Sequence, residues 1–421
     1  MKYSNANIQT DFRLNYVKLL CLKSIFILLI FSCTAGVEKR SQAITEKGPT
    51  DALVDPLPIT GAAQMDKYLP ELEGKRVGIV GNQTSMIGDV HLVDTLISKK
   101  VNVVKVFSPE HGFRGDADAG EHVKNSVDKR TGVPIVSLYG SNKKPKASQL
   151  SGIDVIVFDI QDVGVRFYTY ISTLHYVMEA CAESNIPVVI LDRPNPNGHY
   201  VDGPVLDTAK YRSFVGMHPV PIVHGMTIGE YGMMVNGEKW LKNGVQCDLK
   251  VIPCDFYNRF FQWSLDIRPS PNLRSDLSIS LYPSLCLLEA TDVAVGRGTP
   301  GPFERYGHPS FPDTLESFKP EPDFGAKSPK HNGKKCYGYV LDSTKYSRMD
   351  RLDLSFLINA YGLMNGDLFI GKSKQMFYLL CGTDKILKQL KEGKSEEEIR
   401  SSWTEELDAF KEIRNKYLLY L

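Results

Sequence analysis

The 421-residue sequence lacks the short motifs of several common enzyme classes. It contains neither GxGxxG after the first expected strand nor GxxxxGK[ST], so neither a dinucleotide nor a P-loop nucleotide is indicated. GxSxG is also absent, and no base can be assigned to Ser85 or Ser108, which argues against a serine hydrolase. With 50 basic and 49 acidic residues, the chain has no global field that would attract nucleic acid.

Cysteine is sparse, and no two of the eight cysteines form a CxxC pair, so a zinc ribbon is not expected. Cys247 and Cys254 could form a disulfide in an oxidising compartment, but buried thiols are the preferred interpretation. We therefore expect no metal and no cofactor.

The apolar run at residues 24–33 is too short to span a bilayer but has the length of a signal-peptide core. Ile30, Ser32 and Cys33 resemble a lipobox, in which the cysteine is lipidated and becomes the mature N-terminus. Residues 34–55 have the composition of a flexible tether. We expect an exported protein, either periplasmic or anchored to the outer membrane through Cys33. Later cleavage to a soluble periplasmic protein is the alternative, and an uncleaved anchor is disfavoured.

The chain after residue 33 is longer than one hydrophobic core usually serves, which predicts two domains. Short apolar strands alternate with helical segments over residues 56–255, which predicts an α/β, Rossmann-like domain with a doubly wound, mostly parallel sheet. Residues 256–421 are expected to form a smaller α/β domain that contributes to the cleft. The expected helices are 59–72, about 91–97, about 167–184, 228–241, 355–364, 372–378 and 395–417. Ser395 and Glu398 form a capping box at the start of the last of these.

Five expected strands end in polar residues, which the packing of a sheet does not require. In a parallel sheet these ends share one edge, and ligands bind there near the point where the strand order reverses. A functional cleft is therefore favoured over a set of solvated loops. The five ends are Asn82-Gln83-Thr84, Ser108-Pro109-Glu110-His111, Tyr139-Gly140, Asp159-Ile160-Gln161-Asp162 and Asp192-Arg193-Pro194-Asn195-Pro196-Asn197.

Residues 162–170 are expected to turn at Gly164 into a helix whose first turn carries Arg166, Tyr168 and Tyr170. An arginine beside aromatic rings and free backbone N–H groups suits a sugar acid. The alternative is that the aromatic residues form the core face of the helix while Arg166 pairs with Asp162.

Two further residues are candidates for the cleft. His224 precedes a helix that Thr227 and Glu230 begin as a capping box, and a structural role for this histidine is the alternative. Residues 268–302 are so rich in proline and glycine that no regular element is expected, and this segment is predicted to drape over the cleft. Within it, Arg297 is placed to bind an anion, unless it pairs with Glu289 or Asp292.

Four motifs in one order resemble the bacterial exo-β-N-acetylmuramidase family over roughly residues 55–421. They are Ser108–Gly115, Asp159–Tyr170, Asp192–Pro196 and Gly296–Thr299. The resemblance implies a glycoside hydrolase that releases N-acetylmuramic acid from the non-reducing end of peptidoglycan fragments. It also implies a Rossmann-like domain and a smaller C-terminal domain around the cleft.

Glycoside hydrolysis usually requires two carboxyl groups. Glu110 is the expected acid, because partial burial beside Phe113 would favour its protonated form. Glu121 is ranked first as the second carboxylate, followed by Asp162 and then Asp159. A metal site at Glu110 and His111 is disfavoured, since adjacent side chains rarely converge on one ion.

Muramic acid carries a lactyl carboxylate, which calls for a cation in the cleft. The candidates are Arg166, Arg193 and Arg297. The other expected substrate contacts are Asn82, His111, Arg114, Asp159, Tyr168, Asn195 and His224. The partners expected are peptidoglycan-derived saccharides and a membrane reached only through the lipid anchor, without nucleic acid. A muropeptide-binding protein without catalysis and a metal-dependent amidase or esterase remain as alternatives.

Overall fold

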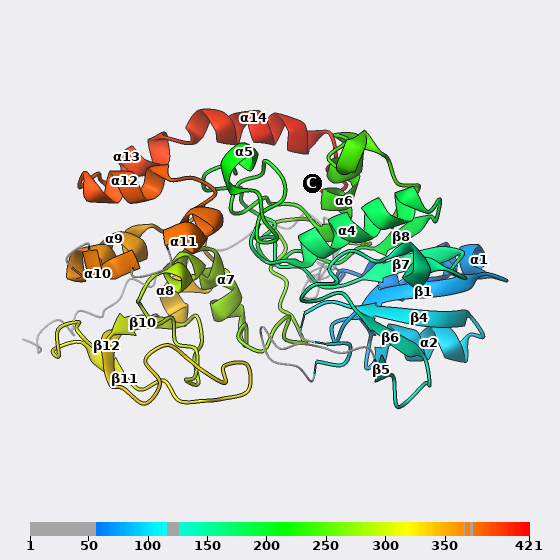
Figure 1. The fold of residues 1–421 in the computed structure, drawn as a ribbon, viewed down its shortest axis with the longest axis horizontal. Coiled ribbons are helices and arrows are strands. Elements are labelled where there is room, and N and C mark those ends of the chain that lie inside the picture. Colours follow the sequence, from blue (N-terminus) through cyan, green and yellow to red (C-terminus); the bar gives the residue numbers. More distant parts are fainter. Residues whose placement is uncertain (1–55, 111, 116–125, 365–366, 371–373) are drawn as a thin grey trace, which may run out of the picture. The chain divides into compact units, whose positions relative to one another are not determined.

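A seven-stranded sheet organises the first half of the chain (Figure 1). Its strand order is β5-β6-β4-β1-β7-β8-β9, and every neighbouring pair is parallel except β5 with β6. The predicted α/β, Rossmann-like, mostly parallel sheet is therefore confirmed. The strands are β1 (Arg76–Gly81), β4 (Asn102–Ser108), β5 (Ser126–Val127), β6 (Pro134–Ser137), β7 (Val155–Asp159), β8 (Val188–Leu191) and β9 (Leu249–Ile252).

The computed structural model describes residues 56–421 apart from 111, 116–125, 365–366 and 371–373. The expected signal segment, Cys33 and the tether lie outside the described residues, as do His111 and Glu121. Among the helices that are described, none is long and apolar enough to cross a bilayer. The six described cysteines are all buried free thiols, so Cys247 and Cys254 are not bonded to each other.

The strand order reverses between β1 and β7. From β1 the chain moves outward through β4 to β6, and it then returns to place β7 on the other side of β1. Gly81 at the end of β1 is in register with Asp159 at the end of β7. The polar residues that follow these two strands therefore meet at the position where such sheets bind ligands.

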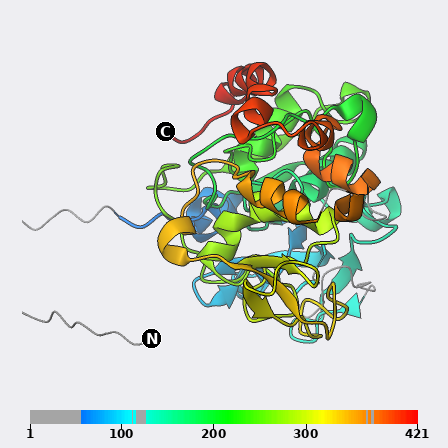
Figure 2. The same cartoon turned by 90° about the vertical axis from the view of Figure 1, so that its left-hand side faces the viewer.

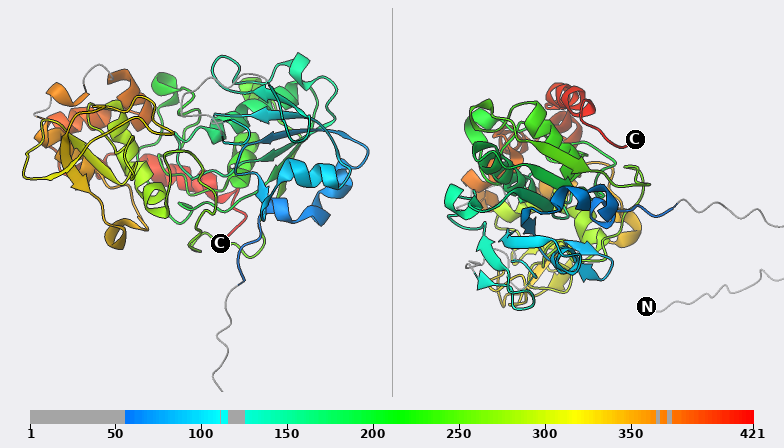
Figure 3. Two further views of the ribbon diagram at one scale, coloured as in Figure 1. Left: turned by 90° about the horizontal axis from the view of Figure 1, so that it is seen from below. Right: turned by 90° about the vertical axis from the view of Figure 1, so that its right-hand side faces the viewer.

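Helices cover both faces of this sheet (Figure 3). Val77 and Ile79 of β1 belong to one core with α2 (Leu92–Ser98), whereas Val80 belongs to the other core with α4 (Tyr170–Glu183) and α6 (Ile228–Gly237). This alternation follows from the two-residue period of a strand. It explains why β7 and β8, which are buried at every position, are apolar at consecutive positions.

Several helix bounds differ from those expected. The segment 59–72 forms three short pieces, η1 (Gly61–Ala63), η2 (Met65–Lys67) and α1 (Leu69–Leu72), because Gln64 and Tyr68 leave the helical conformation. The segment 395–417 is divided at Trp403 into α13 (Glu396–Ser401) and α14 (Thr404–Asn415). The capping boxes predicted at Thr227 and Ser395 are both present.

The second half holds a three-stranded antiparallel sheet and a group of helices (Figure 2). The strands are β10 (Arg305–His308), β11 (Glu316–Phe318) and β12 (Cys336–Val340), and the helices that follow include α9 (Ser355–Leu363), α10 (Asp367–Ile370), α11 (Lys374–Cys381) and α12 (Lys385–Lys391). The expectation that no regular element lies in 268–302 is wrong, because α7 (Asp276–Leu285) and η4 (Cys286–Ala290) lie there. Ser275 caps α7, and Pro283 lies inside this helix and is buried. The burial of α7 therefore outweighs the low helix propensity of proline.

The end of the chain is built into the first half. Nη2 of Arg414 at the end of α14 donates to the Gly225 carbonyl at 2.6 Å, and the Tyr420 hydroxyl donates to Oδ2 of Asp192, also at 2.6 Å. The carboxylate of Glu230, the predicted helix cap, also accepts the backbone N–H of Leu419. Both predicted domains contribute to this packing. The domain boundary predicted at 255/256 stays a prediction.

Candidate active site

The loops after β1 and β7 are joined by hydrogen bonds at the switch point. Oδ1 of Asn82 accepts from both the backbone N–H and the hydroxyl of Thr84, and that hydroxyl accepts the backbone N–H of Gln161 at 3.0 Å. Nδ2 of Asn82 donates to the Tyr170 hydroxyl at 2.9 Å. All four side chains are buried, so Asn82 orients the loops and the first residue of α4.

Tyr168 and Tyr170 connect this edge of the sheet to the second half of the chain. Their rings lie 4.9 Å apart, edge to face, and both hydroxyls donate to the Pro269 carbonyl, at 2.7 Å and 3.3 Å. Nε2 of Gln83 donates to the carbonyl of the preceding residue, Arg268, at 3.3 Å. The segment at Arg268 and Pro269 therefore lies against the switch point.

Arg268 was not among the arginines singled out from the sequence. Its side chain is exposed at the edge of the site, and it forms no ion pair with any described residue. The only sequence signal was its place in the Pro-rich run 268–273, which indicated a rigid turn rather than a binding residue.

Glu110 and Asp162 are the two described carboxyl groups that lie near the paired tyrosines. Glu110 is half-buried. Burial and then the charge of Glu110 raise the pKa of Tyr139 to about 12. The pKa of Tyr170 is also raised, first by burial, then by Glu110 and to a lesser degree by Asp162. Both carboxyl groups therefore lie within electrostatic range of the Tyr170 hydroxyl.

Asp162 is positioned by the turn that follows β7. Its Oδ2 accepts the backbone N–H of Gly164 at 2.7 Å. Gly164 has a φ of +76°, and a Cβ at this position would lie 2.2 Å from the side chain of Asn195, which confirms the need for glycine. Burial raises the pKa of Asp162 to about 7. This carboxyl group can therefore hold a proton near neutral pH.

His224 lies behind Asp162, with its Nε2 3.9 Å from Oδ2 of that carboxyl group. Its Nδ1 accepts the backbone N–H of Met226 at 3.3 Å. Burial lowers the pKa of His224 to about 3, so the ring is neutral and its proton is assigned to Nε2, which faces Asp162. Asn195 is also buried, and it donates to the Met226 carbonyl at 2.9 Å.

Arg166 does not pair with Asp162, as the sequence had suggested as one alternative. Its guanidinium is fully buried and donates to three carbonyls at 2.8 Å each, those of Pro204, Val220 and Leu380. Burial lowers the pKa of this arginine to about 10. With this geometry Arg166 ties the two halves of the chain together and is not open to a substrate.

The other predicted cations are each bound to carboxylates. Arg193 forms two hydrogen bonds with Asp159, at 2.5 Å and 2.9 Å, and both side chains are buried. Arg297 pairs in the same way with Glu289, at 2.5 Å and 2.9 Å, which confirms the alternative given for it. Arg114 forms ion pairs with Asp94 and Asp128.

A hollow lies over the switch point. Side chains from the ends of β1, β7 and β8 line it, together with a segment from the second half of the chain. The lining residues include Thr84, Met86, Gln161, Arg193, Trp263 and Asp266. The arrangement thus offers two carboxyl groups near a tyrosine pair, a hollow at the switch point with a mixed polar and apolar lining, and an exposed arginine, which suits the binding and hydrolysis of an acidic saccharide ligand.

Comparison with known protein families shows to which family this chain belongs. The model of the N-terminal domain of exo-beta-N-acetylmuramidase NamZ matches residues 77–277, and the model of its C-terminal domain matches residues 280–420. The chain belongs to the exo-beta-N-acetylmuramidase NamZ family. The family resemblance inferred from the four motifs is therefore confirmed.

Individual relatives agree with the NamZ family assignment. The chain is 39% identical over 377 residues to the peptidoglycan beta-N-acetylmuramidase NamZ of Bacillus subtilis (strain 168), covering 84% of this chain and 89% of that protein. A crystal structure of a DUF1343 family protein from Bacteroides fragilis matches with 46% identity and a TM-score of 0.80 over 87% of this chain and 99% of that one. A second protein of that family and organism matches with 29% identity and a TM-score of 0.73, over 86% and 99%.

Proposed function

We propose that this NamZ family member is an exo-acting glycoside hydrolase that releases N-acetylmuramic acid from the non-reducing end of peptidoglycan fragments. The match to both NamZ domain models carries the proposal. The effect of both Glu110 and Asp162 on the pKa of Tyr170 supports it as well, because two carboxyl groups then act near one tyrosine and glycoside hydrolysis uses paired carboxyl groups.

Glu110 is the residue proposed to protonate the leaving oxygen. It is half-buried at the end of β4, whereas Asp162 is almost fully enclosed, so Glu110 has better access to a substrate. The second carboxyl group is proposed to be Glu121, which lies outside the described residues, with Asp162 as the alternative. Asp159 is a weaker candidate, since both of its oxygens are bound to Arg193.

The test of this assignment is the release of a chromogenic group from a β-N-acetylmuraminide. Glu110→Gln should lower kcat by about 10²-fold or more with little change in the melting temperature, which is the usual scale of acid–base catalysis. Asp313→Asn, at an exposed carboxylate in the second half, is the matched control. Full activity in Glu110→Gln would remove this residue from the mechanism, and stoichiometric binding of muropeptides without product would favour a binding protein.

The lactyl carboxylate is proposed to contact Arg268, with Arg193 and Arg297 as secondary candidates because each already holds a carboxylate. An exposed guanidinium can pair bidentately with a carboxylate on binding. Arg268→Gln should therefore raise KM for the muraminide, whereas Arg351→Gln, at another exposed arginine, should not. The corresponding β-N-acetylglucosaminide lacks the carboxylate, and equal rates on the two substrates with native enzyme would contradict the proposed specificity.

The proposed location is the cell envelope, with Cys33 as the lipidated residue. This rests on the apolar run at 24–33 and the lipobox-like residues beside Cys33. Labelling with a radioactive fatty acid should mark the native protein but not Cys33→Ser. Unlabelled native protein in the periplasmic fraction would instead support the soluble exported form.

A further inference from the structure

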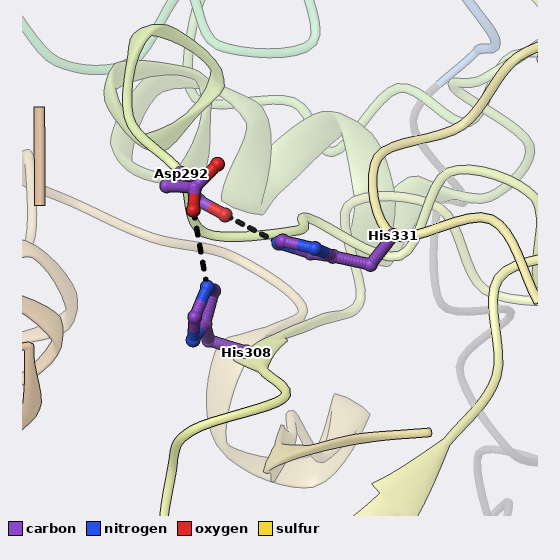
Figure 4. A group of neighbouring side chains, drawn as sticks. All are labelled: Asp292, His308 and His331. Carbon is purple, nitrogen blue, oxygen red and sulfur yellow. Dashed lines mark hydrogen bonds and ion pairs between the residues drawn. The ribbon is translucent and has the colours of Figure 1, made fainter. Parts of the chain in front are cut away.

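Three side chains from separate segments of the second half meet in one cluster, which consists of Asp292, His308 and His331 (Figure 4). Asp292 follows η4, His308 is the last residue of β10, and His331 lies in the turn before β12. One possible ligand atom from each residue lies within 4.8 Å of the other two. None of these residues takes part in the proposed catalytic site.

We propose that this cluster is a binding site for a divalent transition-metal ion of the zinc type. Two imidazoles and one carboxylate form a ligand set that Zn²⁺ commonly takes, with water completing the coordination. Mg²⁺ and Ca²⁺ favour sites built from oxygen atoms and therefore fit less well.

Hydrogen bonds hold both imidazoles against Asp292. Nε2 of His308 lies 3.2 Å from Oδ2 of Asp292, and Nδ1 of the same ring accepts the backbone N–H of Ser310 at 3.0 Å. Nε2 of His331 lies 2.6 Å from the Asp292 backbone carbonyl. Both Nε2 atoms therefore face Asp292, and an ion bound there would replace these two hydrogen bonds while the contact with Ser310 keeps the His308 ring oriented.

The arrangement of the two rings also suits a metal. They lie edge to face with centroids 4.6 Å apart, and both face Asp292. In the absence of metal the same groups form an ordinary hydrogen-bonded cluster, so the experiment must separate these two states.

The backbone that carries the ligands is held by a neighbouring lysine. Nζ of Lys330 donates to the carbonyls of Glu289 at 2.9 Å and Thr291 at 2.6 Å, which fixes the turn that carries His331 against the segment that carries Asp292. His331 itself has a φ of +55°, a conformation uncommon for histidine. A bound ion would therefore link the segments that carry Asp292, His308 and His331, and its role would be to stabilise the sheet of β10, β11 and β12.

The test uses the full chain after dialysis against EDTA. Calorimetric titration with ZnCl₂ should show one equivalent of bound ion that is absent from His308→Gln and from His331→Gln. The same ion should raise the melting temperature of the native protein but not that of either histidine variant. Asp313→Asn, an exposed carboxylate before β11, is the control and should behave like the native protein. Melting curves in EDTA show whether each variant is folded.

The loss of one bound Zn²⁺ equivalent in the two histidine variants distinguishes this site from any other zinc-binding group in the chain. If the native protein binds no Zn²⁺, or if both histidine variants are folded and bind as many equivalents as the native protein, the proposal is overturned. MgCl₂ at the same concentration should cause no comparable shift in melting temperature, and an equal shift would also contradict a zinc-type site.

Discussion

Nε2 of His224 lies 3.9 Å from Oδ2 of Asp162, and both side chains are buried behind the edge of the sheet. Within the described residues, neither Nε2 of His224 nor Oδ1 of Asp162 has a hydrogen-bond partner. Because the pKa of His224 is lowered to about 3, the ring supplies no positive charge to Asp162 at neutral pH. The carboxyl group is therefore held in an environment that favours its protonated form.

Asp162→Asn is expected to change the pH dependence of stability. The pKa of Asp162 is 3.8 when unfolded and about 7 when folded, so the folded state binds more protons between these values and the stability of the native protein falls as the pH rises through this window. Asparagine does not ionise. The stability of the variant relative to the native protein should therefore rise from pH 5 to pH 8 by up to about 3 kcal/mol, since about two pKa units lie between pH 5 and the folded pKa and each is about 1.4 kcal/mol.

Denaturant unfolding at several pH values measures this difference between the two proteins. Asp313→Asn serves as the control, because its carboxylate is exposed. A difference between Asp162→Asn and native protein that stays constant from pH 5 to pH 8 would mean that Asp162 does not titrate in this range.

Tyr170→Phe should lower both stability and activity. The substitution leaves Nδ2 of the buried Asn82 without its acceptor, which costs about 1–3 kcal/mol. It also removes the hydroxyl near Glu110 and Asp162, so kcat/KM on the muraminide should fall. Tyr176→Phe, at a half-buried tyrosine of the same helix, is the control, and equal effects of the two changes would argue against a positioning role for Tyr170.

Arg166→Met is expected to destabilise the fold rather than weaken substrate binding. The change leaves three carbonyls without their donor, and each unsatisfied group costs about 1–3 kcal/mol, partly offset by removal of a buried charge. The melting temperature should fall, while KM of the remaining folded protein stays near the native value. A large increase in KM without loss of stability would return Arg166 to the substrate-binding site.

Removal of divalent metal should lower stability without abolishing hydrolysis. The proposed metal site lies in the second half, whereas the proposed chemistry rests on carboxyl groups. After EDTA treatment the melting temperature should drop, and the initial rate on the muraminide at 25 °C should be unchanged. Loss of activity that Zn²⁺ restores would support the metal-dependent amidase or esterase class.

Local sequence determined much of the fold. Apolar runs of strand length, separated by helical periods, predicted the parallel sheet, and its parallel pairing placed the polar ends of β1, β4, β6, β7 and β8 at one edge. The capping boxes at Thr227 and Ser395 could also be predicted, because each depends on two residues three positions apart. These features follow from patterns of residues that lie close together in the chain.

Only the tertiary structure decided which polar groups are open to a ligand. Arg166, Arg193 and Arg297 looked equivalent in sequence, yet the first binds distant carbonyls and the other two bind carboxylates. The high pKa of Asp162 and the meeting of His308 with His331 likewise depend on burial and on segments far apart in the chain. Pairing and desolvation are set by whichever groups the fold brings together, and local sequence patterns do not contain that information.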